Sequence, residues 1–489
     1  MSTPFNLQTL LSSHSTDGLA LHEQFINPAM AGVLKTIGFD ARYVRGEGAY
    51  LIDDKGQRYL DCLGGYAVFA AGRNHPVIKD ALKQAIDADL PNLPGIGLFR
   101  TSGILAQELV GLVPGNAGDK PEMVFFASGG AEAVDAALKQ ARIATGRKGL
   151  VHCTRSYHGL TMGALSVTGN HEFRDGFGEL LAGTVEVAFN DLASLETALA
   201  PRDKAAFIVE PIQGKGVNLP SADYLREAAK LCAKYGTIFI LDEIQTGLGR
   251  TGRWFAGEHF GMGTTWNPDI VILAKALSGG FVPVSAVLSK RWIHTKVYPS
   301  MNHCSRIQTT FGQNDLAMVA GLAALHVLRE ERLLENATAV GDYLMNGLRT
   351  ALGGFELVKE IRGKGLMIAI EFARPRSMAL KMAWDMLHKL DESLFCQAII
   401  MPLMSDHHIL AQVAGHRLDV IKLIPPLVLT RQDADVLMAA LTTCVAACHR
   451  FPGPAWEVGK KLSAAAVRRF SPGEGGAPPR AVSGEPATV

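Results

Sequence analysis

The chain has 489 residues, of which 48% are hydrophobic and 19% charged, and its formal net charge is +1. This length and apolar content are enough for one large domain or two medium-sized domains with a substantial core. The near-neutral charge argues against nucleic acid or an anionic membrane as the main partner, and no apolar run approaches the length of a membrane span.

The seven cysteines are scattered along the chain and form no CxxC pair. Cys444 and Cys448 lie one helical turn apart, and we expect them to pack in a core rather than bind a metal. This pattern favours a reducing, cytoplasmic setting without a metal site. Residues 1–21 lack a basic start and a continuous apolar segment, so we expect no secretory signal.

Helix-like and strand-like segments alternate after a mixed N-terminal region. Residues 1–30 predict an arm with some helix, and residues 43–53 and 58–61 predict a hairpin around the turn at 54–56. From residue 76, amphipathic segments alternate with short apolar runs, which indicates helices packed on a largely parallel sheet. Helices are expected over residues 77–88, 132–145 and 222–235, and strands over residues 123–126, 149–152, 206–209, 238–241 and 270–273.

A second pattern begins after Gly312 and predicts a smaller α+β unit. Helical periodicity continues to about residue 352, and two strands and a last helix are expected over residues 355–361, 365–372 and 433–451. The tail is rich in Pro, Gly, Ala and Ser, which is typical of partial disorder. We therefore predict an arm (1–30), the N-terminal part of a small domain (31–75), a large domain (76–325), the C-terminal part of the small domain (326–451) and a tail (452–489).

Two apolar runs end on residues that suit pyridoxal phosphate chemistry. Lys275 follows the run 270–274 and precedes a glycine pair, while Asp242 ends the run 238–241. In enzymes of this kind, a lysine amine forms a Schiff base with the cofactor and a carboxylate keeps the pyridine nitrogen protonated. A strand-end lysine taken alone is more often simply solvated. The two strand ends together favour the cofactor interpretation.

Three further strand ends carry candidate cofactor residues. Gly129 and Gly130 lie where a strand turns into a helix, and free amides at a helix start bind phosphate, although many ordinary turns share this pattern. Tyr157 suits stacking on a cofactor ring or packing on its own loop, and the role of His158 is equally open. Glu210 is either functional or a solvated cap. Because ligands bind at the carboxyl ends of strands in open α/β sheets, we expect these side chains to meet at one edge.

Taken as a set, these motifs resemble those of the class III pyridoxal phosphate aminotransferases, such as the acetylornithine, ornithine, 4-aminobutyrate and putrescine enzymes. The resemblance implies a fold of type I, in which a large α/β domain with a mostly parallel seven-stranded sheet flanked by helices is joined to a smaller α+β domain. It covers roughly residues 30–450 and is carried by Glu210-Pro-Ile-Gln-Gly, Asp242-Glu-Ile-Gln-Thr-Gly-Leu-Gly-Arg-Thr-Gly, Ala274-Lys-Ala-Leu-Ser-Gly-Gly, Thr309-Thr-Phe-Gly and Ile361-Arg-Gly-Lys-Gly.

The resemblance also implies roles for the residues around the cofactor ring. Lys275 would bind the cofactor aldehyde and then shuttle the substrate proton. Asp242 would pair with the pyridinium nitrogen, and Gln245 would hydrogen-bond the ring hydroxyl. Ile244 and Tyr157 would sandwich the ring between them.

The expected phosphate contacts of the cofactor come from two chains. By resemblance, the amides of Gly130 and Ala131 would bind the phosphate, and Thr310 would reach it from a neighbouring subunit. We therefore expect a homodimer with shared active sites. Relatives often have a hydroxyl residue where this chain has Gly129, so the phosphate would depend more on backbone amides here.

Three positions depart from the family pattern and bear on the substrate. Relatives that recognise an α-carboxylate often have an arginine where this chain has Leu160. Relatives that use glutamate often carry an acid and an arginine, which pair with each other, where this chain has Lys215 and Lys422. Lysine does not reproduce the flat, bidentate fork of arginine, although its charge still attracts a carboxylate.

These departures favour a more apolar substrate, such as an aliphatic amine, a diamine or a long-chain aldehyde. Tyr66 and Phe69 match a segment that lines the pocket in relatives and would add apolar wall. The alternative is that Leu160 and Lys215 are neutral changes and that the enzyme uses an ordinary ω-amino acid, acetylornithine or 4-aminobutyrate with 2-oxoglutarate.

Two other functions stay open beside aminotransferase activity. A related aminomutase would move an amino group within one molecule and would need no second amino acceptor. A non-enzymatic binding protein of the same fold would be expected to have lost Lys275 or Asp242, and both are present. Small-molecule amines and keto or aldehyde compounds are therefore the expected partners.

Overall fold

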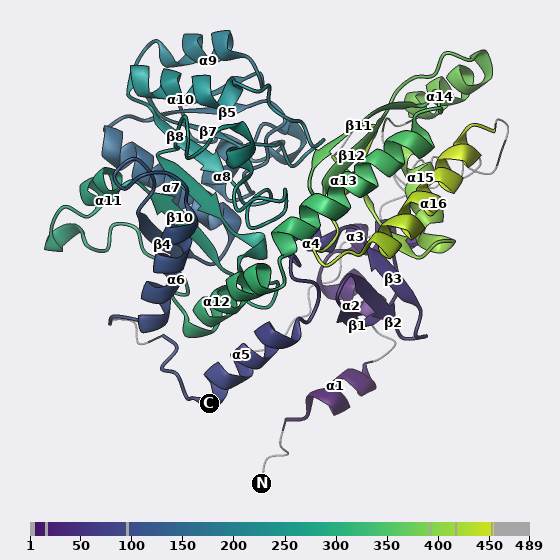
Figure 1. Cartoon of the computed structure of the whole chain (residues 1–489), viewed down its shortest axis with the longest axis horizontal. Coiled ribbons are helices and arrows are strands. Elements are labelled where there is room, and N and C mark those ends of the chain that lie inside the picture. Colours follow the sequence, from purple (N-terminus) through teal and green to yellow (C-terminus); the bar gives the residue numbers. More distant parts are fainter. Residues whose placement is uncertain are drawn as a thin grey trace, which may run out of the picture.

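The structure is a computed structural model that describes residues 5–14, 18–93, 97–390, 392, 394–415, 418–450 and 453. Figure 1 shows a large sheet with its helices at the left and a group of smaller sheets and helices at the right. The predicted tail, residues 452–489, lies outside the described residues apart from Gly453. Within the described ranges, no helix is long and apolar enough to cross a membrane.

The large sheet has seven strands, and all run parallel except β10, which is antiparallel to both of its neighbours. Every residue of the central strands β7, β8 and β9 is buried, so both faces of the sheet are covered there. This burial explains why these strands appear in the sequence as continuous apolar runs. In spatial order the strands are β4 (Met123–Ala127), β10 (Ser285–Ser289), β9 (Ile270–Leu273), β8 (Ile238–Asp242), β7 (Lys204–Val209), β5 (Gly149–Cys153) and β6 (Thr184–Val187).

The mostly parallel seven-stranded sheet is confirmed, and five of its strands lie where the sequence predicts them. The sequence does not mark β6 or β10, because polar residues leave each of them an apolar run too short to stand out. β6 contains Glu186, and β10 begins and ends with serine. Only their pairing with a neighbouring strand makes them part of the sheet.

The helices beside the large sheet begin close to their predicted positions. One of them, α7, packs on β7, β9 and β10 through a face of buried alanines, which allows the helix to approach the sheet closely. The helices of this region are α5 (Pro76–Asp87), α6 (Arg100–Leu112), α7 (Gly130–Thr145), α8 (Met162–Ser166), α9 (Leu192–Leu199), α10 (Tyr224–Tyr235), α11 (Arg291–Val297) and α12 (Asp315–Glu330), with short 3-10 turns η1 (His171–Phe173), η2 (Ala256–Phe260), η3 (Lys275–Ser278) and η4 (Met301–His303).

Two smaller sheets lie beside the large one, and the first of them combines strands from both ends of the chain. One has the order β1-β2-β3-β13, and its strand β13 pairs in parallel with β3, far away in sequence. The other has the order β11-β12-β15-β14 and is antiparallel throughout. The strands are β1 (Tyr43–Glu47), β2 (Tyr50–Asp53), β3 (Arg58–Asp61), β11 (Val358–Lys364), β12 (Met367–Phe372), β13 (Ile409–Leu410), β14 (Gln412–Val413) and β15 (Val420–Leu423).

The predicted hairpin is right at one turn and wrong at another. The turn at residues 54–56 joins the antiparallel strands β2 and β3 as expected. Residues 43–53, however, form two strands instead of one, because the chain reverses at Gly48, where φ is 55°. A positive φ suits glycine. The alternation of apolar and polar residues over 43–53 continues through this turn, so the sequence predicts one strand there instead of two.

The remaining helices frame the small sheets and the N-terminal arm. α13 contacts α16 and β11, and α15 contacts α14, α16 and β14. Cys444 and Cys448 on α16 are both buried, as the sequence predicts. The helices are α1 (Leu7–Ser13), α2 (Gly18–Phe25), α3 (Pro28–Thr36), α4 (Gly64–Ala67), α13 (Leu333–Leu352), α14 (Met378–Leu390), α15 (Leu394–Ser405) and α16 (Arg431–Cys448).

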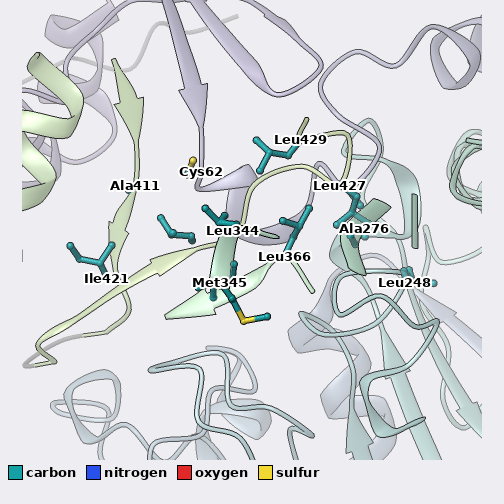
Figure 2. Close-up of a cluster of buried hydrophobic side chains, with 14 of the residues drawn as sticks. Cys62, Leu248, Ala276, Leu344, Met345, Leu366, Ala411, Ile421, Leu427 and Leu429 are labelled. Carbon is teal, nitrogen blue, oxygen red and sulfur yellow. The ribbon is translucent and has the colours of Figure 1, made fainter. Parts of the chain in front are cut away.

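One hydrophobic core connects the small sheets with the large one. Figure 2 shows Cys62 from the N-terminal region and Ile421 from β15 in the same cluster as Leu248 and Ala276 from the large region. All four side chains are almost completely buried. A continuous core holds the two regions against each other, which fixes the space between them. The predicted domain boundaries themselves stay predictions.

Candidate active site

A cavity of about 1290 Å³ lies where the carboxyl ends of the large sheet's strands face β14, β15 and α15. Its position is the one expected for a ligand site in an open α/β sheet. All of the predicted site residues except Thr310 and Phe69 line this cavity, namely Tyr66, Gly129, Gly130, Ala131, Tyr157, His158, Leu160, Glu210, Lys215, Asp242, Ile244, Gln245, Lys275 and Lys422.

Lys275 begins η3 and is separated from the buried strand β9 by Ala274 alone. Its backbone φ is 43°, a strained value for a residue with a side chain, and strain of this kind gathers at functional sites. Burial lowers the pKa of its amine, and the carboxylates of Asp242 and Glu210 oppose that shift. A lysine amine with a lowered pKa is more often neutral and therefore more nucleophilic toward a carbonyl carbon.

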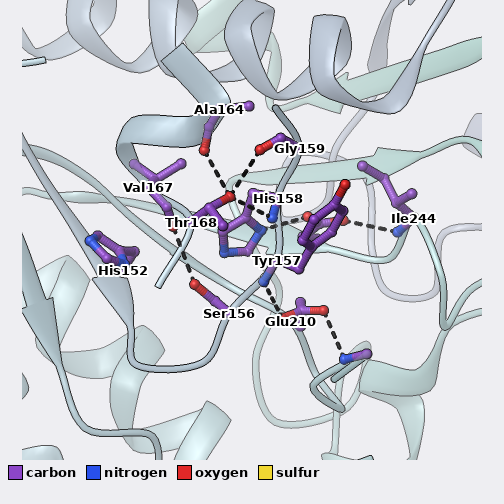
Figure 3. Close-up of polar contacts among 12 residues, drawn as sticks. His152, Ser156, Tyr157, His158, Gly159, Ala164, Val167, Thr168, Glu210 and Ile244 are labelled. Atoms are coloured by element: carbon purple, nitrogen blue, oxygen red, sulfur yellow. Dashed lines mark hydrogen bonds and ion pairs between the residues drawn. The ribbon is translucent and has the colours of Figure 1, made fainter. Parts of the chain in front are cut away.

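Asp242 ends β8 and is held by two donors. Its Oδ2 lies 2.7 Å from His158 Nδ1, and its Oδ1 accepts a hydrogen bond of 3.0 Å from the amide of Ile244. The amide of His158 donates to Thr168 Oγ1 at 3.1 Å, which fixes the histidine in turn (Figure 3). The Asp242 and His158 side chains are almost completely buried. The carboxylate is therefore pre-oriented before any ligand arrives.

Glu210 lies at the end of β7 and is buried, so the alternative of a solvated cap is wrong. Its two oxygens accept hydrogen bonds from the amide of Gly214 at 2.8 Å and from the amide of Tyr157 at 3.2 Å, and Figure 3 shows the bond from Tyr157. Burial raises the pKa of its carboxyl. The Tyr157 ring meets Phe173 edge to face, with ring centroids 5.6 Å apart. Glu210 thus anchors the loop that carries Tyr157 into the cavity.

The first turn of α7 offers an anion-binding site. The amides of Gly130 and Ala131 have no acceptor among the described residues, and both residues line the cavity. Free amides at the start of a helix of this length, together with the helix dipole, favour a phosphate. A Cβ on Gly130 would lie 3.2 Å from Cδ1 of Ile244, so glycine keeps this approach open.

Two residues lie away from the cavity of their own chain. Thr310 is exposed and does not line it. Phe69, which was expected to add apolar wall, stacks under the Arg73 guanidinium, with the carbon of that group 4.0 Å from the ring centroid. Of these two aromatic residues, Tyr66 lines the cavity and Phe69 does not. The φ of 62° at Tyr66 turns the backbone sharply there.

The small-domain wall of the cavity, formed by α15, β14 and β15, carries Lys422. Its Nζ donates to the carbonyl oxygen of Gly214 at 2.8 Å and to Gln245 Oε1 at 3.4 Å. Burial, followed by the neighbouring charge of Lys275, lowers the pKa of Lys422 to about 7. By contrast, Lys215 forms an ion pair of 2.7 Å with Glu172.

Sequence reasoning missed several residues that line the same cavity. Gln397 on α15 and Gln412 on β14 face it, as do Val413, Phe173 and Val282. None of them lies in a motif or at the end of a predicted strand. Only β14, a two-residue strand that pairs with β15, brings Gln412 here, so no local signal in the sequence would have found it.

Comparisons with known proteins agree with this geometry. The family model described as aminotransferase class III matches residues 35–445. The chain is 35% identical to the aminotransferase PigE of Serratia sp. over 87% of its own length, but it spans only 53% of that protein. It is also 35% identical to an acetylornithine aminotransferase of Methanosarcina acetivorans, covering 87% of this chain and 98% of that one. The solved ornithine aminotransferase of Toxoplasma gondii, with partial occupancy of pyridoxal phosphate at its active site, superposes with a TM-score of 0.77 at 29% identity, over 91% and 99% of the two chains.

The fold and the site together define a fold type I enzyme that depends on pyridoxal phosphate. Within that class, the chain belongs to the class III aminotransferase family. It is therefore an enzyme that transfers amino groups between small molecules.

Proposed function

We propose that this aminotransferase holds pyridoxal phosphate on Lys275 and Asp242 and acts on an apolar aliphatic amine or aldehyde. The cavity fits the cofactor, because free helix-start amides, a buried amine and a pre-oriented carboxylate line one space. When bound, the cofactor supplies an electron sink that stabilises negative charge on the substrate carbon. The protein supplies orientation, charge and proton transfer.

In this proposal the residues at the strand ends divide the work. Lys275 Nζ binds the cofactor and then carries the proton to and from the substrate carbon. Asp242, oriented by His158, keeps the ring nitrogen protonated. Ile244, Tyr157 and Gln245 line the same cavity. Ile244 and Tyr157 would hold the ring between them, and Gln245 would hydrogen-bond the ring hydroxyl. The amides of Gly130 and Ala131, beside Gly129, hold the phosphate.

The observation that carries the apolar substrate is the surface of Leu160. Leu160 lines the cavity and is 51% exposed. Contact between an apolar side chain and water is unfavourable, so a ligand that covers Leu160 would be stabilised. Phe173, Val282 and Val413 add further apolar surface to the same cavity. Lys215 is neutralised by Glu172, so its charge is not free for a substrate carboxylate. An alkyl chain would cover this surface and be stabilised by about 0.8 kcal/mol per buried methylene.

A panel of amine donors and Leu160→Arg test this proposal. The unaltered enzyme should give higher kcat/KM for alkyl amines as the chain lengthens, by a few-fold per methylene. In Leu160→Arg, kcat/KM for alkyl amines should fall about tenfold, while donors with a distal carboxylate improve. Flat dependence on chain length, or no change of preference in the variant, would contradict an apolar substrate.

A half-reaction separates transfer from isomerisation. Enzyme mixed with amine alone should stop after one turnover with the cofactor in its amino form, as followed by absorbance. Completion without any keto or aldehyde acceptor would instead identify an aminomutase. The same measurement with 4-aminobutyrate and N-acetylornithine tests the alternative of an ω-amino acid substrate.

A homodimer with shared sites is part of the same proposal. It is supported by Thr310, which is exposed and outside the cavity of its own chain, as a residue that serves a partner's site would be. Sedimentation should give a dimer, and Thr310→Ala should weaken cofactor binding without changing the oligomeric state. A monomer with full activity would refute it.

A cytoplasmic location is likewise a proposal. The seven cysteines are all free thiols, six of them buried, with no pair joined by a disulfide. Such cysteine usage is typical of a reducing compartment. Fractionation of cells that produce the tagged protein would test it.

A further inference from the structure

The charge of Lys215 is compensated by the short turn η1. The Lys215 side chain is only 14% exposed, although the residue lines the cavity. Its Nζ lies 2.7 Å from Glu172 Oε1 and 4.1 Å from the centroid of the Phe173 ring, over which it is placed. A mostly buried ammonium group needs compensation of this kind. Because Glu172 and Phe173 are neighbours in η1, one ammonium group fixes this turn at two consecutive residues.

The Phe173 ring is held from a second side by Tyr157. The two rings meet edge to face at an interplanar angle of 72°, an arrangement that aromatic pairs favour. The residue before η1 is tied to the same loop, because Asn170 Nδ2 donates to the carbonyl oxygens of Ser156 at 2.8 Å and Arg155 at 3.2 Å. Contacts with Lys215 and Tyr157 therefore fix the ring of Phe173 in the cavity that it lines.

One buried carboxylate aligns the two loops that contact Phe173. Glu210 accepts hydrogen bonds from the amide of Tyr157 and from the amide of Gly214, which directly precedes Lys215. A further bond joins the same two loops, from Gln213 Nε2 to the carbonyl oxygen of Thr154 at 2.7 Å. An isolated surface ion pair does little by itself. The pair of Lys215 and Glu172 differs because its lysine belongs to a loop that is anchored in the core.

We propose that Phe173 is a specificity-determining residue, against which the alkyl chain of the substrate packs, and that Lys215 and Glu172 are positioning residues that keep its ring in the cavity. The inference rests on the proposed function, in which the substrate is an apolar amine or aldehyde. It gives Lys215 a role other than contact with a substrate carboxylate. The ammonium group is directed onto Glu172 and the ring, so the cavity presents an aromatic surface there instead of a free charge.

Amines of different length test the role of Phe173 in the cofactor-loaded enzyme. Phe173→Ala should lower kcat/KM about tenfold for hexylamine and less than about threefold for propylamine, because only the longer chain gains from the aromatic surface. The loss should lie in KM rather than in kcat, since the contact binds the chain and takes no part in the chemistry. Steady-state kinetics with both amines would measure it.

Lys215→Met tests the positioning role, because it keeps an unbranched side chain but removes the charge. It should lower kcat/KM for hexylamine about three- to tenfold and add little to Phe173→Ala, because a positioning residue acts through its partner. Lys215→Arg keeps a cation for both the ring and Glu172, so it should stay within about twofold of the unaltered enzyme. These two variants also test the proposal if Phe173→Ala folds poorly.

Glu172→Gln tests what the ion pair withholds from the substrate. It leaves the Lys215 ammonium without its carboxylate, so kcat/KM for 6-aminohexanoate relative to hexylamine should rise about tenfold. The two donors have chains of equal length and differ in the distal carboxylate. Lys215→Met should show no such rise, since it has no charge to release.

The matched controls are Lys234→Met and Glu196→Gln. These residues form an ion pair of the same 2.7 Å length between α10 and α9, and Lys234 Nζ lies 5.0 Å from the centroid of the Tyr235 ring. Neither residue lines the cavity. Both variants should leave every ratio within about twofold of the unaltered enzyme.

Three results would overturn the role of Phe173 and its two positioning residues. They are equal losses for hexylamine and propylamine in Phe173→Ala, fully additive losses in the double variant with Lys215→Met, and an unchanged donor ratio in Glu172→Gln. The proposed apolar substrate fails separately. If the unaltered enzyme prefers 6-aminohexanoate to hexylamine, while Phe173→Ala still penalises six-carbon donors more than three-carbon donors, the role of Phe173 stands without it.

Discussion

The two sides of the cavity differ in how completely their polar groups are paired. On the strand-end floor, formed by Lys275, Asp242, His158 and Glu210, the carboxylates already accept hydrogen bonds from neighbouring amides or from histidine. On the small-domain wall, Gln412 lacks a partner for its amide nitrogen within the described residues. The floor is pre-organised for a group that stays bound, whereas the wall is left open for molecules that come and go.

The largest effect should come from the floor. Lys275→Ala removes the amine that binds the cofactor, so turnover should fall to background and the visible absorption of lysine-bound cofactor should be lost. Reconstitution followed by absorbance and a transamination assay would measure both. Retained transamination in this variant would refute the assignment of the floor.

Asp242→Asn should be the next largest change. It keeps the shape of the side chain but removes the charge that faces the ring nitrogen, so kcat/KM should fall at least about 100-fold, the scale for one pre-organised electrostatic group. Glu243→Gln is the matched control. Glu243 is buried next to Asp242 but accepts from Gly257 outside the cavity, so its loss should leave kcat/KM within about threefold.

If Asp242→Asn and Glu243→Gln lower kcat/KM equally, the distinction between the floor of the cavity and its surroundings is wrong. The cofactor content of each purified variant must be measured alongside kcat/KM. A fall in activity that follows lost cofactor alone would place Asp242 in cofactor retention rather than in the chemistry.

The smallest effect should be a pH dependence on the wall. Lys422 has a pKa lowered to about 7 by burial and by Lys275, with Glu210 opposing and with Lys215 and Arg250 lowering it further. A lowered lysine pKa means that the ammonium is present below about pH 7 and is lost as pH rises. Glutarate serves as an unreactive carboxylate ligand for Lys422, and its Kd should therefore increase several-fold per pH unit above the midpoint.

Bound cofactor sharpens this expectation. When Lys275 holds the cofactor, its own charge no longer opposes that of Lys422, so the midpoint should lie above the value for the free chain. Calorimetry from pH 6 to pH 9 would measure it. Lys422→Leu should flatten the profile and weaken carboxylate ligands while sparing alkyl amines. A profile that persists in this variant would assign the titration to another group.

The class of fold and the floor of the site could be predicted from the sequence. Strands buried on both faces leave continuous apolar runs, and residues that end such runs meet at one edge of the sheet because the strands are parallel. Lys275, Asp242 and Glu210 each end one of these runs, and all three line the cavity. The sequence could not show that Glu210 is buried, because that depends on loops packed above it.

The sequence by itself determined a parallel α/β sheet and an amine and a carboxylate at its edge, since short-range patterns encode both. Only the tertiary structure decided what faces them. Gln412 reaches the cavity through a two-residue strand, Lys215 is neutralised by Glu172 from another loop, and Thr310 lies outside. These outcomes depend on contacts between segments far apart in sequence, which no local period or motif records.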